Sequence, residues 1–142
     1  MKIREVMTGE IASVNYEDTV ERAAQLMKRY NIGSVPICDG EKVIGIVTDR
    51  DIALRSVADG QNVMRQCVRE VMSTNPVTIS PDMDVHEAAR VMSERQIRRL
   101  LVVEEGNLIG MISIGDLAVE PKLSDNAGEA LSSISEPASH NI

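Results

Sequence analysis

Apolar residues early in the chain recur with the i, i+3, i+4, i+7 spacing that places them on one face of a helix. These residues are Val20, Ala23, Ala24 and Met27. A short strand, Ala12–Val14, precedes the predicted helix. Two β-branched runs, Val35–Cys38 and Val43–Val47, follow it and have the pattern of a β-hairpin with a turn at Asp39 and Gly40. With a last short helix from about Asp49 to Val57, the first half is predicted to fold as β-α-β-β-α.

The same pattern returns after 65 residues, so that Met7 falls on Met72. The register holds without a gap from Ile3 to Ala53 and their matches, which chance does not produce. The second half is therefore predicted to repeat the β-α-β-β-α order. Its elements are expected at Val77–Ile79, in a helix carrying Val85, Ala88, Ala89 and Met92, at Leu100–Val103 and Leu108–Ser113, and from about Gly115.

Helix boundaries carry signals of their own. Asn31 is expected to end the first main helix. Asp84 and Glu87 have the spacing of a capping box with Asp in place of Ser or Thr, and they are expected to fix the start of the second.

One copy alone would leave an apolar face of its three-stranded sheet uncovered. We therefore expect a mixed α/β (α+β) fold in which two βαββα units pack with pseudo-two-fold symmetry. The units are assigned to residues 1–60 and 61–120, with a turn at 58–65. Residues 121–142 are expected to form a tail with a weak helix over 126–134 and disorder from Ser135 onward.

Both predicted last strands end in a hydroxyl residue followed three positions later by an aspartate. The pairs are Thr48 with Asp51 and Ser113 with Asp116. In the structural interpretation, the hydroxyl caps the next helix and the carboxylate lies near its positive end. In the functional interpretation, the same place is an anion site beside a carboxylate that suits a ribose diol. Spacing alone leaves both open.

These motifs and the repeat resemble a tandem cystathionine-β-synthase (CBS) domain pair, also called a Bateman module. The resemblance rests on Gly-h-h-Thr-x-x-Asp at 45–51 and Gly-h-h-Ser-x-x-Asp at 110–116, where h is apolar. It also rests on Val-Met-Thr at 6–8 and Val-Met-Ser at 71–73, and it covers roughly residues 3–118. It implies a non-catalytic regulatory module that binds an adenosyl ligand (AMP, ADP, ATP or S-adenosylmethionine) in a cleft between the units and signals to a partner protein.

The resemblance also implies roles for particular residues. The aspartates Asp51 and Asp116 would take ribose hydroxyls, while Thr48 and Ser113 would bond the phosphate or the ribose. The segments 10–13 and 75–78 are looser candidates for a wall against the adenine.

The two copies differ where Gly33 and Ser34 align with Arg98 and Arg99. The resemblance implies that basic residues there touch phosphates, and the planar, permanently charged guanidinium suits a phosphate. We therefore expect Arg98 or Arg99 to complete the Ser113 and Asp116 site for a phosphorylated ligand. The first site is expected to be empty or to take a less charged ligand.

The alternative is a structural role for Arg98 and Arg99. They would then form a solvated surface pair that balances Glu94 and Glu104.

Composition limits the partners. A formal charge of −7 and a pI near 4.8 would repel a phosphate backbone, which argues against a nucleic-acid partner. The N-terminus is polar from its second residue, and no apolar run approaches membrane-spanning length. The protein is expected to be cytoplasmic, with no membrane partner.

Cysteine, histidine and methionine give no sign of a metal site. Cys38 and Cys67 lie far apart and belong to no ligand cluster, so they are interpreted as small apolar side chains. His86 and His140 lack a second ligand at metal spacing. The methionines at helical spacing are expected in core or interface packing, and the resemblance implies a homodimer. Those methionines are Met27, Met64 and Met92.

The sequence disfavours two other functions and leaves a third as the alternative. No Ser/His/Asp or Cys/His set can be assembled, and there is no glycine-rich phosphate loop, so we expect no enzyme, no catalytic residue and no required cofactor. A protein-protein interaction module without a small ligand is the alternative function, and it predicts no thermal shift with any nucleotide. A DNA-binding regulator is disfavoured by the acidic balance.

Overall fold

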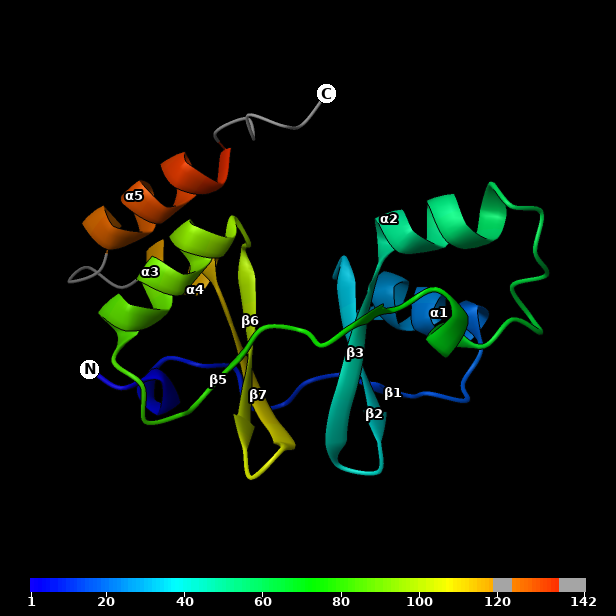
Figure 1. The fold of residues 1–142 in the computed structure, drawn as a ribbon, viewed down its shortest axis with the longest axis horizontal. Helices are drawn as coiled ribbons and strands as arrows, with labels where there is room; N and C mark the ends of the chain where they lie inside the picture. The colour runs from blue at the N-terminus through cyan, green and yellow to red at the C-terminus, as the bar shows by residue number, and fades with distance from the viewer. Residues whose placement is uncertain (119–123, 136–142) are drawn as a thin grey trace. The chain divides into compact units, whose positions relative to one another are not determined.

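The computed structural model describes residues 1–118 and 124–135, and the predicted β-α-β-β-α order is found in both copies (Figure 1). The mixed α/β fold class is confirmed. The short strand β4 was not predicted. Helix α5 is longer than the expected helix over 126–134, and it includes Ser135, where disorder was expected to begin. The rest of the expected disordered end, residues 136–142, lies outside the described residues. In chain order the elements are η1 Ile3–Glu5, β1 Val14–Asn15, α1 Val20–Tyr30, β2 Ser34–Asp39, β3 Lys42–Thr48, α2 Asp49–Ile52, η2 Ala53–Val57, η3 Val68–Glu70, β4 Ser73–Thr74, β5 Thr78–Ile79, α3 Val85–Arg95, β6 Arg99–Glu104, β7 Asn107–Ser113, α4 Ile114–Ala118 and α5 Ser124–Ser135.

The main helices begin and end near the predicted places. α1 ends at Asn31 in the left-handed conformation, with φ 53°. Asp84 caps α3 by accepting a hydrogen bond from the His86 backbone N–H at 2.8 Å, and this bond, with a second from the His86 ring, lowers the pKa of Asp84. The predicted capping box is wrong in its second half, because the Glu87 carboxylate pairs with Arg90 one turn along the helix.

The two compact units exchange their leading segments. Residues 1–10 belong with 77–104 and with the described chain from 109 on, which we call the second-repeat unit. Residues 11–76 belong with 105–108, which we call the first-repeat unit. The leading segments, residues 1–10 and their repeat equivalents 66–75, therefore each pack on the repeat that does not follow them in the chain. The expected units, 1–60 and 61–120, follow the sequence repeat. The compact units of the structure differ from them because the leading segments are exchanged.

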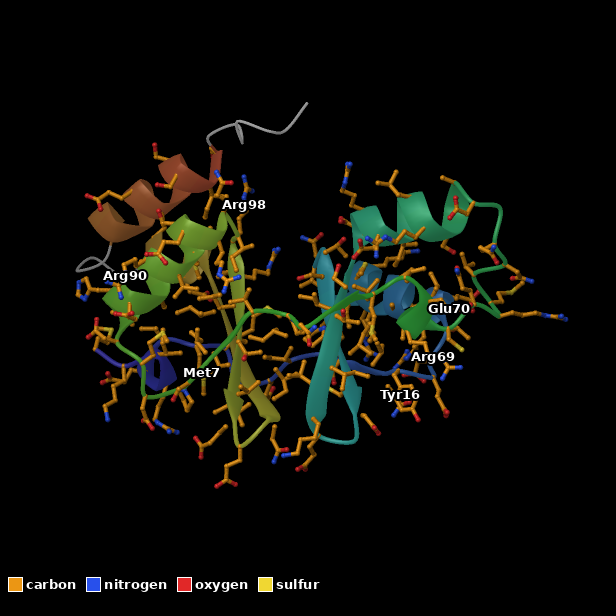
Figure 2. All side chains as sticks on the ribbon, viewed as in Figure 1. Met7, Tyr16, Arg69, Glu70, Arg90 and Arg98 are labelled. Atoms are coloured by element: carbon orange, nitrogen blue, oxygen red, sulfur yellow. The ribbon has the colours of Figure 1, made fainter. Side chains whose placement is uncertain are left out.

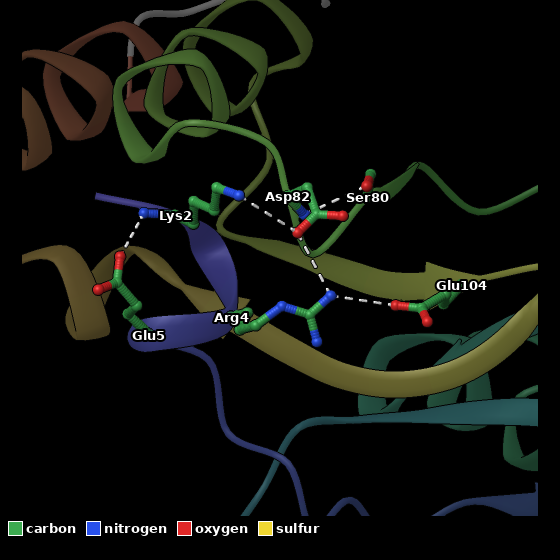
Figure 3. A network of polar contacts seen from close by, with 6 residues as sticks. All are labelled: Lys2, Arg4, Glu5, Ser80, Asp82 and Glu104. Carbon is green, nitrogen blue, oxygen red and sulfur yellow. Dashed lines mark hydrogen bonds and ion pairs between the residues drawn. The ribbon is translucent and has the colours of Figure 1, made fainter.

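Backbone hydrogen bonds attach residues 1–10 to the second-repeat unit. The Ile3 N–H donates to the Met83 carbonyl at 2.9 Å, and the Thr8 and Met111 backbones bond each other at 2.9 and 3.0 Å. Arg4 adds ion pairs to Asp82 at 3.3 Å and to Glu104 at 3.2 Å (Figure 3). Arg4 also donates a hydrogen bond to each of these two carboxylates. Both bonds raise the pKa of Arg4, and the bond to Glu104 has the larger effect.

The segment 66–75 is attached to the first-repeat unit in the same way. The Val68 N–H donates to the Asp18 carbonyl at 2.8 Å, and β4 pairs antiparallel with β3. Arg69, the repeat equivalent of Arg4, lies over the Tyr16 ring, with 5.8 Å between its Cζ atom and the ring centroid (Figure 2).

Each unit has its own hydrophobic core. The leading segments contribute Ile3 to one core and Val68 to the other, and both side chains are fully buried. The core of the second-repeat unit is formed by Ile3, Ile79, Val85, Ala88, Ala89, Met92, Leu100, Val102, Ile112, Leu117 and Ala130. The core of the first-repeat unit is formed by Val14, Val20, Ala23, Leu26, Met27, Val35, Ile37, Val47, Val68 and Val71.

Helix α5 makes the second-repeat unit different from the first. It packs against α3 and α4 (Figure 1), and it buries Ala130 in their core. Among the described residues, no equivalent helix covers α1 and α2 of the first-repeat unit. There, Leu54 and Val57 remain 49% and 64% exposed.

A methionine of each leading segment packs directly on a glycine of the last strand. A Cβ atom at Gly45 would lie 2.5 Å from the Met72 sulfur and 2.9 Å from the Ser73 carbonyl oxygen. Met7 packs on Gly110 in the same way, and a Cβ atom at Gly110 would lie 2.5 Å from the Met7 sulfur. Glycine is therefore needed at both positions for the leading segment to lie flat on the sheet.

Candidate functional site

The first candidate site lies where β3 passes into α2. The Thr48 N–H donates to Asp51 Oδ2 at 2.9 Å, and the Asp51 N–H donates to Thr48 Oγ1 at 3.1 Å. The structural interpretation of this pair, a capping box, is therefore correct. Both side chains are half-buried.

The second candidate site repeats this geometry where β7 passes into α4. The Ser113 N–H donates to Asp116 Oδ2 at 2.8 Å, and the Asp116 N–H donates to Ser113 Oγ at 3.2 Å. Both hydroxyl residues therefore cap the helix that follows, as the structural interpretation expects, and in both cases the aspartate bonds back to the cap. We call the two places the first junction and the second junction.

Capping leaves part of each aspartate available. The box uses Oδ2 of Asp51 and of Asp116, and no described residue bonds to either Oδ1. A carboxylate oxygen that is half-buried, fixed and without a partner can accept a bond from a ligand hydroxyl. The capping role and a binding role are therefore compatible at both junctions.

Arg98 and Arg99 border the second junction. The Ile114 N–H, next to Ser113, donates to the Arg98 carbonyl at 2.8 Å, which fixes the start of β6 beside the start of α4. Both arginine side chains are exposed, and Arg98 is visible in Figure 2.

The glutamates that might balance these arginines have other partners. Glu94 pairs with Arg90 at 3.9 Å, and Glu104 pairs with Arg4 at 3.2 Å. In the described part of the chain, no ion pair joins Arg98 or Arg99 to any carboxylate. The two guanidinium groups are therefore free to meet an anion.

The first junction contains a buried hydroxyl that sequence reasoning did not single out as a binding group. Ser34 lies directly opposite Thr48 in the β2–β3 pairing, so both side chains point to the same face. Ser34 is only 6% exposed, and its Oγ has no hydrogen-bond partner among the described residues. The only signal in the sequence was the alignment of Ser34 with Arg99, since burial depends on the strand register.

The looser candidates for an adenine wall, residues 10–13 and 75–78, take no part in the hydrogen bonds of either junction. Their role stays a prediction.

The cysteines form no disulfide, and two of the three methionines at helical spacing lie in the hydrophobic cores. Cys38 and Cys67 are free thiols, and burial raises the pKa of Cys38 despite a hydrogen bond with Ser13. Met27 and Met92 lie in the cores, but Met64 is 62% exposed and belongs to neither. Within residues 1–118 and 124–135, no three His, Cys, Asp or Glu side chains gather as metal ligands would.

The helices of the structure bear on membrane insertion. None in the described ranges combines the length and the apolar character needed to cross a bilayer.

A fold of two βαββα units with a hydroxyl and carboxylate pair at each last strand defines a tandem repeat protein, and comparison with known proteins supplies the family. The sequence matches the CBS domain over residues 3–57 and again over 68–121. The chain therefore belongs to the CBS-domain family, as a tandem pair, and such a pair is a regulatory module.

Relatives support this assignment over the whole chain. The CBS domain-containing protein YhcV of Bacillus subtilis is 41% identical, and the match covers 97% of this chain and 98% of that protein. The crystal structure of Hypoxic Response Protein I, with two coordinated zinc ions, is 30% identical with a TM-score of 0.77, and covers 84% of this chain and 98% of that one.

A more distant solved structure shares the fold. It is the CBS domain protein PAE2072 from Pyrobaculum aerophilum complexed with AMP, which is 23% identical with a TM-score of 0.77. The match covers 90% of this chain and 98% of that chain.

Proposed function

We propose that this CBS pair is a non-catalytic sensor that binds an adenosyl ligand at its junctions and reports metabolite state to a partner protein. Asp51 and Asp116 hold ribose hydroxyls through their available Oδ1 atoms. Thr48 and Ser113 add bonds to the ribose or the phosphate. The second junction, with Arg98 and Arg99, takes the phosphorylated ligand.

The observation that carries this proposal is that Arg98 and Arg99, beside Ser113 and Asp116, form no ion pair with a carboxylate in the described part of the chain. Exposed guanidinium groups next to a fixed carboxylate fit a ribose phosphate, because the carboxylate accepts from the hydroxyls while the guanidinium donates to the phosphate. The AMP complex of PAE2072 provides a precedent in the same fold.

Binding without turnover acts through linkage. A ligand that binds only the folded protein stabilises it by an amount that grows with the logarithm of its concentration over its Kd, and it changes the affinity for a partner by the coupling free energy between the two sites.

Calorimetric titration with AMP tests the proposal. We expect Asp116→Ala to weaken AMP binding by at least about tenfold, which is about 1.4 kcal/mol. Asp51→Ala is the matched control, because it breaks the same capping box at the first junction and should leave AMP affinity nearly unchanged. Equal affinity of wild type and Asp116→Ala for AMP would refute the site. No thermal shift of wild type with AMP, ATP or S-adenosylmethionine would favour the ligand-free interaction module.

We also propose a homodimer formed through α2 and η2 of the first-repeat unit. Leu54 and Val57 both lie in η2 and are both largely exposed. In the second-repeat unit, α5 packs on the equivalent helix α4, so the same kind of surface is already covered there.

The dimer proposal predicts the effect of a charge at its centre. We expect Val57→Asp to convert the dimer to a monomer in sedimentation velocity, because a carboxylate would be buried without a partner. Leu131→Asp is the control, since Leu131 is 42% exposed on α5, outside the proposed interface. A monomeric wild type, or a dimer that survives Val57→Asp, would contradict the proposal.

A further inference from the structure

The two junctions have the same backbone frame but opposite charge. In the first, the Asp49 N–H donates to the Gly33 carbonyl at 3.0 Å; in the second, the Ile114 N–H donates to the Arg98 carbonyl at 2.8 Å. The residues of these two bonds correspond to each other along the repeat, so the difference between the junctions lies in the side chains. The charged groups of the first junction are Asp49, Arg50 and Asp51, with a formal charge of −1, and those of the second are Arg98, Arg99 and Asp116, with a formal charge of +1.

Where the second repeat has the side chain of Arg98, the first has a glycine with a carboxylate beside it. A Cβ atom at Gly33 would lie 3.2 Å from Asp49 Oδ2, so the Asp49 carboxylate occupies the space where a side chain at position 33 would begin. In the second repeat, this combination of glycine and aspartate is replaced by Arg98 and Ile114. A phosphate placed there would meet a like charge in the first junction and an opposite charge in the second.

Ser34 offers the first junction a neutral polar group instead. Its Oγ is buried beside Thr48 and has no partner. A buried hydroxyl without a hydrogen bond costs stability, and a ligand hydroxyl or amine that reaches it past the half-buried Thr48 side chain would remove that cost.

We propose that the first junction selects an adenosyl ligand that carries no phosphate, whether neutral or cationic, while the second takes a phosphorylated one. This inference rests on the proposed function and adds the chemical class of ligand for each junction. The repulsion by Asp49 rejects the phosphate, and the Ser34 hydroxyl contributes to affinity for the nucleoside.

The first experiment titrates adenosine, S-adenosylmethionine and AMP into wild type and into Arg98→Ala/Arg99→Ala. Both arginines are exposed, so the variant should fold. We expect AMP affinity to fall at least about tenfold while adenosine affinity stays within about twofold. AMP binding to the variant as tightly as adenosine would overturn the inference. If none of the three ligands binds wild type, it is the proposed function that fails.

The second experiment removes the buried hydroxyl. We expect Ser34→Ala to weaken adenosine binding by roughly fivefold or more, which is the loss of one hydrogen bond to a neutral group. The melting temperature should not fall, since the hydroxyl has no partner in the free protein. Ser56→Ala is the matched control, because Ser56 is fully buried, also has an unpartnered Oγ, and lies in η2 away from Thr48. Unchanged adenosine affinity in Ser34→Ala would count against the assignment.

The third experiment transfers the second junction's side chains to the first. In the Arg98→Ala/Arg99→Ala background, we expect Gly33→Arg/Asp49→Ile to restore AMP binding. Arg50→Ala in that same background checks the one cation of the first junction. AMP binding that depends on Arg50, or a folded transplant that still rejects AMP, would contradict the inference. Should the transplant not fold, the first two experiments still decide the question.

Discussion

Replacing Ile3 by alanine is expected to destabilise the second-repeat unit by about 2–5 kcal/mol, although Ile3 stands at the start of the first repeat. Its side chain is fully buried in the core that contains Met92, Leu100 and Ile112, and the smaller alanine would leave a cavity there. Hydrogen exchange followed by mass spectrometry should show lost protection in α3 and β6, with α1 and β2 little changed.

Val68→Ala is the matched control for Ile3→Ala. Val68 is the repeat equivalent of Ile3 and is fully buried in the other core, so protection should fall in α1 and β2 instead. Equal losses in both units, or a loss confined to the first repeat for Ile3→Ala, would contradict the exchange of leading segments.

A methyl group at Gly45 is expected to cost about 1–3 kcal/mol, because it overfills a packed contact. The Met72 side chain can shift to relieve the 2.5 Å approach, but the Ser73 carbonyl at 2.9 Å is backbone and can move only with the leading segment. Urea unfolding of Gly45→Ala should therefore show a lower midpoint with an unchanged slope.

Gly9→Ala provides the control for Gly45→Ala. A Cβ atom at Gly9 meets nothing within 4 Å, so this substitution should leave the unfolding midpoint nearly unchanged. If both variants unfold at the same urea concentration, the methionine and glycine contact does not constrain the sheet.

The order of elements could be predicted because hydrophobic periodicity determines it locally. The apolar positions of α1 and the alternation of the β2–β3 hairpin are visible in a few turns or residues of sequence, and the repeat confirmed each prediction a second time. The capping box at Asp84 failed at Glu87 for a local reason as well. The Glu87 carboxylate pairs with Arg90, one turn further along the helix, and not with the Asp84 backbone N–H.

The exchange of leading segments could not be predicted from the repeat. Arg4 and Arg69 are the same residue of the motif, as are Met7 and Met72, and the glycines that receive the methionines are also equivalent. The shared motif residues therefore do not tell which sheet each leading segment joins. The partners of the two arginines do differ, since Arg4 pairs with Asp82 and Glu104 whereas Arg69 lies over the Tyr16 ring, but these partners become visible only in the structure.

The candidate site was predictable in part. The Thr48 and Asp51 pair was visible as a spacing, and the structure shows that this spacing closes a capping box. The orphaned Ser34 hydroxyl and the position of the Asp49 carboxylate over Gly33 were not visible, because both depend on how β2 and β3 align.

The exchange has a consequence for the two repeats. A chain with a single 65-residue repeat would have no second sheet to receive its leading segment in the way seen here. It could reproduce this packing only by exchanging leading segments with a second molecule. Two repeats in one polypeptide make this exchange internal, so that each repeat depends on the other for one buried residue of its core, Ile3 or Val68.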